Sequence, residues 1–88
     1  MTKSEAIDLM RQYAAFTDEF AADRSDGRRH SYNLLISLGH IRSMPDRFPE
    51  EGSVKKAMRW LGFMQGALWM VRAFTLEELK DHSRRKSL

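Results

Sequence analysis

The run of residues 60–71 contains no charged side chain, and it constrains the fold more than any other part of the sequence. Arg59 and Arg72 flank this run, which makes it too short for a bilayer span of about 20 apolar residues. Around it, apolar residues recur at helical spacing on nearly every side. We therefore expect one continuous helix from near Ser53 to Phe74, at the centre of the fold and enclosed by protein on almost all sides.

Two other segments share the 3.6-residue periodicity of an amphipathic helix. The first runs from about Lys3 to Arg24, and Thr2 with Glu5 forms a capping-box pattern at its start. The second covers roughly Arg28 to Ser43, and the polar residues 25–27 between them either form a turn or continue one long helix. The expected core face of the first helix comprises Ala6, Leu9, Met10, Tyr13, Phe16, Thr17 and Phe20.

Proline and a second capping pattern divide the rest of the chain. Pro45 and Pro49 predict a loop from Met44 to Ser53, because each lacks a backbone donor and disfavours helix in the residue before it. Thr75 and Glu78 match a capping box that begins a short helix ending near residue 84. The fold class is thus all-α, a small bundle of three main helices plus a short C-terminal helix, in one domain covering residues 1–88.

The length and composition favour self-association. A chain of 88 residues without cysteine has no disulfide to supplement a small core, so its stability must come from helix packing or from other subunits. We expect a homo-oligomer. The net charge of +3 is too weak to indicate a nucleic-acid partner, although the basic tail near Arg84 and Arg85 keeps that alternative open.

No catalytic or metal-binding pattern appears in the sequence. It has no cysteine, no histidine pair at helical i, i+4 spacing, no nucleophile elbow and no glycine-rich phosphate loop. We therefore expect no enzyme, no metal and no cofactor. Because the first residues do not resemble a signal peptide and no run is long enough for a membrane span, we expect a cytoplasmic protein.

One side of the predicted central helix combines glycines, cations and an aromatic ring. Two glycines four residues apart weaken a helix by about 1 kcal/mol each relative to alanine, so a close neighbour should offset that cost. The neighbour is either another helix packed tightly at the glycines or an anionic ligand stacked on the aromatic ring. The candidate ligand-binding residues are Lys55, Arg59, Gly62, Gly66 and Trp69.

Gln65 lies among apolar neighbours on the same helix. If this amide is buried, it needs hydrogen-bond partners. The leading interpretation is a subunit interface, with Gln65 bonded to its counterpart in a symmetry-related copy and with Leu61 and Leu68 beside it. Contact with a ligand is the alternative.

The segments 56–69 and 75–84 resemble a recurrent ending of small uncharacterised accessory proteins of tailed bacteriophages. The resemblance is strongest at residues 59–66, which read Arg-Trp-Leu-Gly-Phe-Met-Gln-Gly. Residues 32–40 resemble the same proteins more weakly. The resemblance covers about half of the chain and brings no catalytic residue with it. It implies expression in the cytoplasm of an infected bacterium and a role in blocking a host protein or a defence system.

Three functional hypotheses follow from these observations. The first is a phage-encoded, non-enzymatic accessory protein that binds and inhibits a host or defence factor. The second is a small-molecule binder that sequesters an anionic nucleotide, such as a cyclic nucleotide signal, beside Arg59 and Trp69. The third is a weak nucleic-acid binder that uses the basic C-terminal tail.

Overall fold

The structure, a computed structural model, describes the backbone of residues 1–24 and 32–88 and the side chains of residues 1–20 and 38–88. The described backbone forms four helices, α1 (Lys3–Arg24), α2 (Tyr32–Arg47), α3 (Val54–Met70) and α4 (Leu76–Arg85). No strand occurs in the described backbone, so the prediction of an all-α fold is confirmed. The possible turn at residues 25–27 and the predicted helix start at Arg28 lie outside the described residues.

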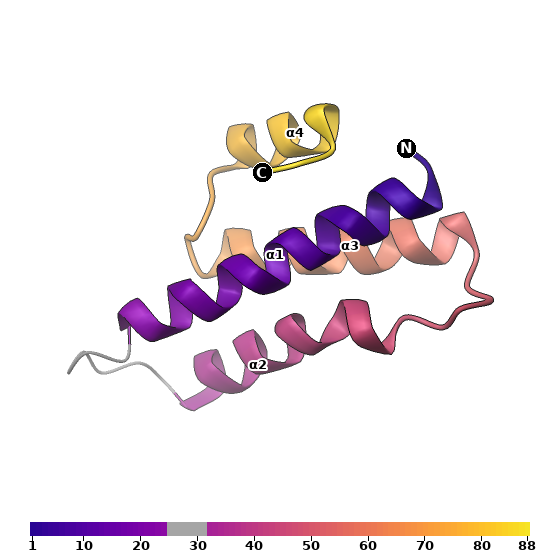
Figure 1. Cartoon of the computed structure of the whole chain (residues 1–88). Helices are drawn as coiled ribbons and strands as arrows, with labels where there is room; N and C mark the ends of the chain where they lie inside the picture. Colours follow the sequence, from indigo (N-terminus) through magenta and orange to yellow (C-terminus); the bar gives the residue numbers. More distant parts are fainter. Residues whose placement is uncertain (25–31) are drawn as a thin grey trace.

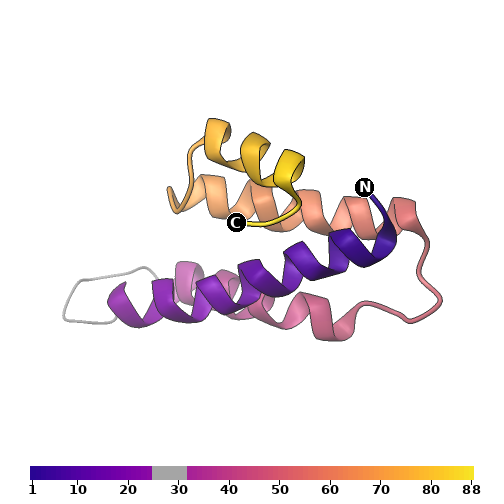
Figure 2. The ribbon, with the colours of Figure 1, turned by 45° about the horizontal axis from the view of Figure 1, so that its top comes forward.

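The long helix α1 crosses both α2 and α3 and packs against each of them (Figure 1). Helix α4 packs on α3, on the side away from α2, and Figure 2 shows it above α3 with α1 crossing beneath. The end of the chain then returns to α1, where the Leu88 N–H donates to Gln12 Oε1 at 2.9 Å. Among the described residues, helix α3 therefore has neighbours on three sides, and its fourth side is open.

Side-chain caps begin three of the helices. Thr2 Oγ1 accepts from the Glu5 N–H at 3.1 Å and Glu5 Oε1 accepts from the Thr2 N–H at 2.8 Å, which confirms the first predicted capping box. The second box, between Thr75 and Glu78, is confirmed by the same reciprocal pair of bonds at 3.1 Å and 2.9 Å. At α3, Ser53 Oγ accepts from the N–H of residue 56 at 3.1 Å.

The hydrophobic core lies where α1 meets α2, α3 and α4. The predicted face of α1 is confirmed in large part, since five of the seven expected residues are at most 1% exposed. The buried residues of the core cluster are Ala6, Leu9, Met10, Tyr13, Ile41, Met44, Ala57, Leu61, Met64, Leu68 and Leu79. Phe16, Phe48, Trp60 and Phe74 are among the partly buried side chains that pack against it.

Helix α2 does not stop before Pro45 as predicted but continues to Arg47. Proline inside a helix leaves the carbonyl four residues earlier without its usual donor and normally costs about 3 kcal/mol. Here Ile41 and Met44 are buried in the core at 1% and 5% exposure. Packing of this last turn against the core outweighs the local preference, so the loop begins after Arg47 rather than at Met44.

Helix α3 ends at Met70, four residues before the predicted end at Phe74. The Arg72 N–H donates to the Trp69 carbonyl at 3.0 Å and the Ala73 N–H to the carbonyl of residue 68 at 2.9 Å, which is a Schellman closure. Arg72 takes the left-handed conformation with φ 61°. That position is usually glycine, and an arginine there gives the sequence no sign that the helix ends.

Helix α3 is not enclosed by protein on almost all sides, which corrects the prediction for this segment. Its inner residues, including Leu61 and Leu68, are buried. On the outer side, Phe63 is 56%, Trp69 49% and Met70 72% exposed. Apolar residues all around a helix predicted burial all around, but none of the described residues of the chain covers the outer side of α3.

Candidate binding surfaces

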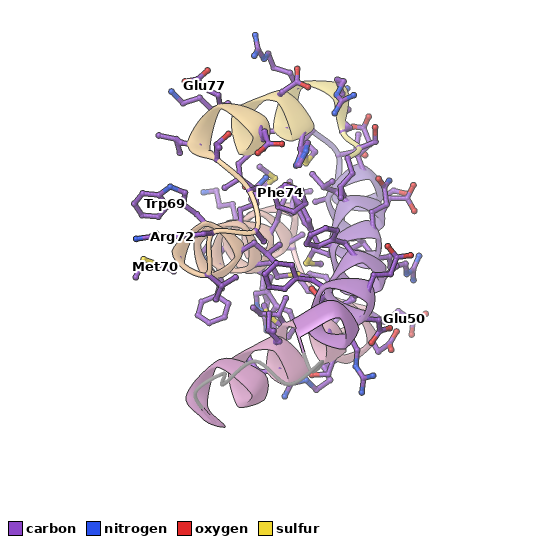
Figure 3. The ribbon with its side chains drawn as sticks, turned by 90° about the vertical axis from the view of Figure 1, so that its left-hand side faces the viewer. Glu50, Trp69, Met70, Arg72, Phe74 and Glu77 are labelled. Carbon is purple, nitrogen blue, oxygen red and sulfur yellow. The ribbon has the colours of Figure 1, made fainter. Side chains whose placement is uncertain are left out.

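The exposed side of α3 forms a continuous surface that we call the outer face. In Figure 3, Trp69 and Met70 point away from α1, between α4 on one side and α2 on the other. Contiguous apolar surface of this kind is uncommon on a soluble monomer and marks a site of interaction. The residues of the outer face are Lys55, Met58, Arg59, Gly62, Phe63, Gly66, Trp69 and Met70, all of them exposed.

The five residues that the sequence suggested for ligand binding all lie on this outer face. Lys55, Arg59 and Trp69 are exposed, and so are both glycines. A Cβ atom added at Gly62 or at Gly66 would meet no atom within 4 Å. Tight packing of another described helix of this chain therefore does not account for the two glycines, and the space beside them is open as far as the described residues extend.

Replacing Gly66 by alanine should stabilise the isolated monomer. The position is an exposed helix interior with room for a methyl group, where alanine is favoured over glycine by about 0.5–1 kcal/mol. Urea denaturation at the lowest protein concentration that circular dichroism allows would measure the gain. Gly62→Ala should shift the midpoint in the same direction, whereas Gly52→Ala, where a Cβ would lie 2.6 Å from the Phe48 ring, should lower it.

The three residues suggested for a subunit interface have partners within the chain. Leu61 is 2% exposed and Leu68 is fully buried, both in the core cluster. Gln65 Nε2 donates to Tyr13 Oη at 3.2 Å and to Ser83 Oγ at 2.9 Å. The structure thus accounts for all three without a second subunit, and the amide of Gln65 links α3 to α1 and α4.

A buried polar network joins α1, α3 and α4 at this point. Tyr13 Oη lies 2.9 Å from His82 Nδ1. Because the Tyr13 hydroxyl accepts from Gln65, its own hydrogen is available to His82 Nδ1, which requires the imidazole to be neutral with its hydrogen on Nε2. The Phe74 ring packs edge-on against the His82 ring with centroids 4.8 Å apart, so an aromatic wall shields the network.

Burial shifts the pKa values of both ring groups toward the neutral form. Desolvation lowers the pKa of His82 below its usual 6.5, Arg85 lowers it further, and the carboxylates of Glu78 and Asp81 oppose the shift. Desolvation also raises the pKa of Tyr13 above 10, against a smaller opposite effect of the Gln65 hydrogen bond. The network is therefore built for a neutral imidazole and a neutral phenol.

The free energy of unfolding should fall when the solution is acidified through the range in which His82 titrates. The folded pKa lies below the unfolded value of 6.5, so the unfolded chain binds more protons between the two values. Stability should therefore be full above the unfolded pKa, fall below it, and level off below the folded pKa. Urea denaturation between about pH 8 and about pH 5 would measure the slope, which His82→Gln should flatten.

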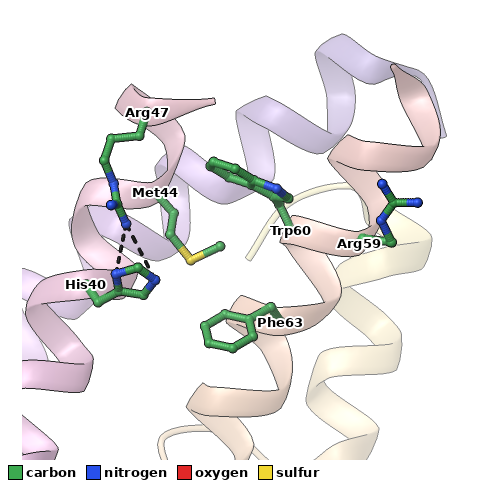
Figure 4. A pocket seen from close by; sticks show the side chains of 6 residues that line it. All are labelled: His40, Met44, Arg47, Arg59, Trp60 and Phe63. Carbon is green, nitrogen blue, oxygen red and sulfur yellow. Dashed lines mark hydrogen bonds between the residues drawn. The ribbon is translucent and has the colours of Figure 1, made fainter. Parts of the chain in front are cut away.

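A cleft of about 330 Å³ opens between α2 and α3 (Figure 4). Arg47 Nη2 donates to His40 Nδ1 at 2.8 Å, which holds both side chains together on α2. Trp60 and Phe63 point from α3 into the same space. The lining residues are His40, Met44, Arg47, Arg59, Trp60 and Phe63. We call this the α2–α3 cleft.

The candidate ligand residues do not meet in one cleft. Arg59 lines the α2–α3 cleft, whereas Gly66 and Trp69 line a smaller one of about 200 Å³ between α3 and α4. Lys55 and Gly62 line neither. The sequence did not single out Arg47, Trp60 or Phe63 for binding, because nothing in one helix shows which side chains of another will face it.

The basic C-terminal end is largely paired within the chain. Lys86 Nζ lies 3.0 Å from Glu5 Oε2 and Arg85 Nε lies 2.9 Å from Asp81 Oδ2. The hydrogen bond from the Thr2 backbone N–H and the Lys86 ammonium lower the pKa of Glu5 to about 2. These pairs reduce the positive potential that the nucleic-acid hypothesis requires.

Within the described residues, no group of three His, Asp or Glu side chains could hold a metal ion. In the same part of the chain, no helix has the length and apolar character needed to cross a membrane. Comparison of the chain with protein-family models, with curated proteins and with solved structures finds no match.

Proposed function

We propose that this chain is a non-enzymatic binding protein that acts by protein–protein association, with the outer face of α3 as its association surface. One observation carries the proposal. Phe63, Trp69 and Met70 are each about half or more exposed around two glycines, and among the described residues no atom lies within 4 Å of a Cβ added at either glycine. Exposed aromatic and methionine side chains beside an arginine have the composition of protein interface centres.

The phage resemblance suggests what such a protein does. A small protein without catalytic groups can inhibit a host or defence factor by occupying the surface that the factor uses. This step rests on the resemblance of residues 56–69 and 75–84, and it supports inhibition by occupancy inside an infected bacterium as the biological role.

Site-specific photo-crosslinking in bacterial cells tests the association surface. A photoreactive phenylalanine at Phe63 replaces one aromatic ring by another on the outer face, and the same group at the exposed Asp8 on α1 is the control. We expect protein adducts from position 63 and few from position 8. Equal labelling from both positions would show that the outer face has no special role.

A second candidate function is supported by the α2–α3 cleft. Arg47 and Arg59 line it, and in the described part of the chain neither forms an ion pair with a carboxylate. Trp60 and Phe63 add two aromatic rings on which a planar group can stack. The cleft is also within the size range of small-molecule sites. These features fit a planar anion such as a nucleotide.

Thermal denaturation with adenosine monophosphate, adenosine and inorganic phosphate tests this candidate. A ligand at about one hundred times its dissociation constant should stabilise the fold by about 2.7 kcal/mol, a shift in Tm of about 10–20 °C for a domain of this size. We expect the nucleotide to shift Tm most and Arg47→Gln to reduce the shift, with Arg72→Gln as the matched control outside the cleft. An unchanged Tm at high nucleotide concentration would rule the candidate out.

A further inference from the structure

We infer that the occupant of the outer face is a second copy of this chain, whose α3 packs antiparallel to the first across a two-fold axis near the level of Met64. The inference rests on the proposed function and names the partner of the same surface. In a two-fold interface the same patch serves both copies, so it must be complementary to itself. The outer face meets that condition in its apolar residues and in its two glycines.

The spacing of the outer-face residues is symmetric about Met64. When Gly62 lies level with Gly66 of the second copy, Met58 lies level with Met70 of that copy and Arg59 with its Trp69. Each methionine then lies level with a methionine of the other copy, and each Trp69 ring with an arginine. Phe63, one residue from the axis, lies beside its own counterpart. An antiparallel pair therefore covers the side chains that the monomer leaves exposed.

The glycines set how closely the two helices can approach. Helices in contact lie about 8–10 Å apart, and the short end of that range requires small residues where they cross. Gly62 and Gly66 lie at the centre of the proposed contact, and no atom of the described part of the chain lies within 4 Å of a Cβ added at either position. Larger residues precede Gly62 and follow Gly66 along the helix. The two α3 helices would therefore approach most closely at the glycines, and their larger side chains would pack against each other on either side.

The charges of α3 favour the antiparallel direction. Its first turn contains Lys55 and no acidic residue, and its last turn contains no basic residue, which is the reverse of what the helix dipole prefers. An antiparallel second copy places Lys55 beside the negative end of the partner helix, the end that carries the exposed Arg72 and Glu77 of that copy (Figure 3). A parallel copy would bring the two lysines together instead.

Oligomeric state and helix direction can both be measured. Light scattering after size exclusion should give the mass of a dimer for the natural chain. Phe63→Glu, which places two carboxylates beside the axis, should raise the dissociation constant at least about tenfold, equivalent to about 1.4 kcal/mol. Ala15→Glu adds the same charge to an exposed position of α1 and should leave the dimer intact.

The absence of cysteine allows the register to be tested with single cysteine substitutions. A mixture of Met58→Cys and Met70→Cys proteins should be joined by a short bismaleimide, because those positions lie level across the axis. Met58→Cys protein alone should stay unjoined, since the two copies of residue 58 would lie about 18 Å apart along the helices. Linkage of Met58→Cys protein to itself would show a parallel pair and overturn the inference.

The outcomes separate the inference from the proposed function. A monomer at every concentration overturns the second copy as occupant. If photo-crosslinking from position 63 then captures a different protein and position 8 does not, the association surface stands with another occupant. If position 63 gives no adduct with any protein, the proposed function fails as well.

Discussion

Replacing Leu61 by alanine is expected to lower the free energy of unfolding by about 2–5 kcal/mol, because removal of a buried leucine side chain loses its transfer energy and leaves a cavity. Leu61 is 2% exposed and belongs to the cluster formed by α1, α2, α3 and α4. A domain of this size has a total stability of only about 5–10 kcal/mol. The variant should therefore be marginally folded at room temperature.

Urea denaturation followed by circular dichroism measures this loss, with Met58→Ala as the matched control. Met58 lies on the same helix but is 42% exposed, so its truncation should change the monomer's stability by less than about 1 kcal/mol. The loss at Leu61 should also be independent of protein concentration, since this side chain contacts only its own chain. A loss that appears only at high concentration would place Leu61 at an interface instead.

Local signals were sufficient to predict the start and the buried face of α1. Its start is set by the reciprocal bonds of Thr2 and Glu5, and its buried face repeats at helical spacing from Ala6 to Thr17. The capping box at Thr75 likewise placed the start of α4 correctly. Both signals act within four residues along the chain, so the sequence contains all the information that they require.

The ends of α2 and α3 depend on contacts that the sequence does not display. Packing of Met44 against the core carries α2 through Pro45, although proline predicts a stop there. The left-handed Arg72 ends α3, although an arginine gives no such signal. In both cases the tertiary structure overrides the propensity of one residue.

Periodicity showed which residues share a side of α3, but not whether anything covers that side. Lys55, Gly62 and Trp69 do lie together on the outer face, as predicted. The expectation that protein encloses the helix failed, because an apolar helix face looks the same in a sequence whether its partner lies in the same chain or in another one. The α2–α3 cleft was missed for a related reason, since Arg47 and Trp60 come from different helices.

The buried polar network of Tyr13, Gln65 and His82 could not be predicted from the sequence either. Tyr13 and His82 are 69 residues apart, and no local pattern pairs them. The sequence did indicate that Gln65 would need a partner if buried, and the structure supplies two within the chain. The sequence stated the requirement correctly, but only the fold identifies the groups that satisfy it.

Replacing Tyr13 by phenylalanine is expected to lower the free energy of unfolding by about 1–3 kcal/mol, the usual cost of leaving a buried polar group without its partner. The ring itself still fits, since only the hydroxyl is removed. His82 Nδ1 then loses its donor at 2.9 Å while the imidazole stays 5% exposed. Gln65 keeps Ser83 as an acceptor, so most of the loss falls on His82.

A double-mutant cycle with His82→Phe isolates this contribution. The phenylalanine at position 82 keeps an aromatic ring against Phe74 and removes the nitrogen that is hydrogen-bonded to the Tyr13 hydroxyl. Because replacing both partners by apolar groups removes the unmet hydrogen-bond requirement, the double variant should be more stable than the sum of the single losses predicts, by about 0.5–3 kcal/mol. Strict additivity would mean that the 2.9 Å contact between Tyr13 and His82 contributes nothing to stability.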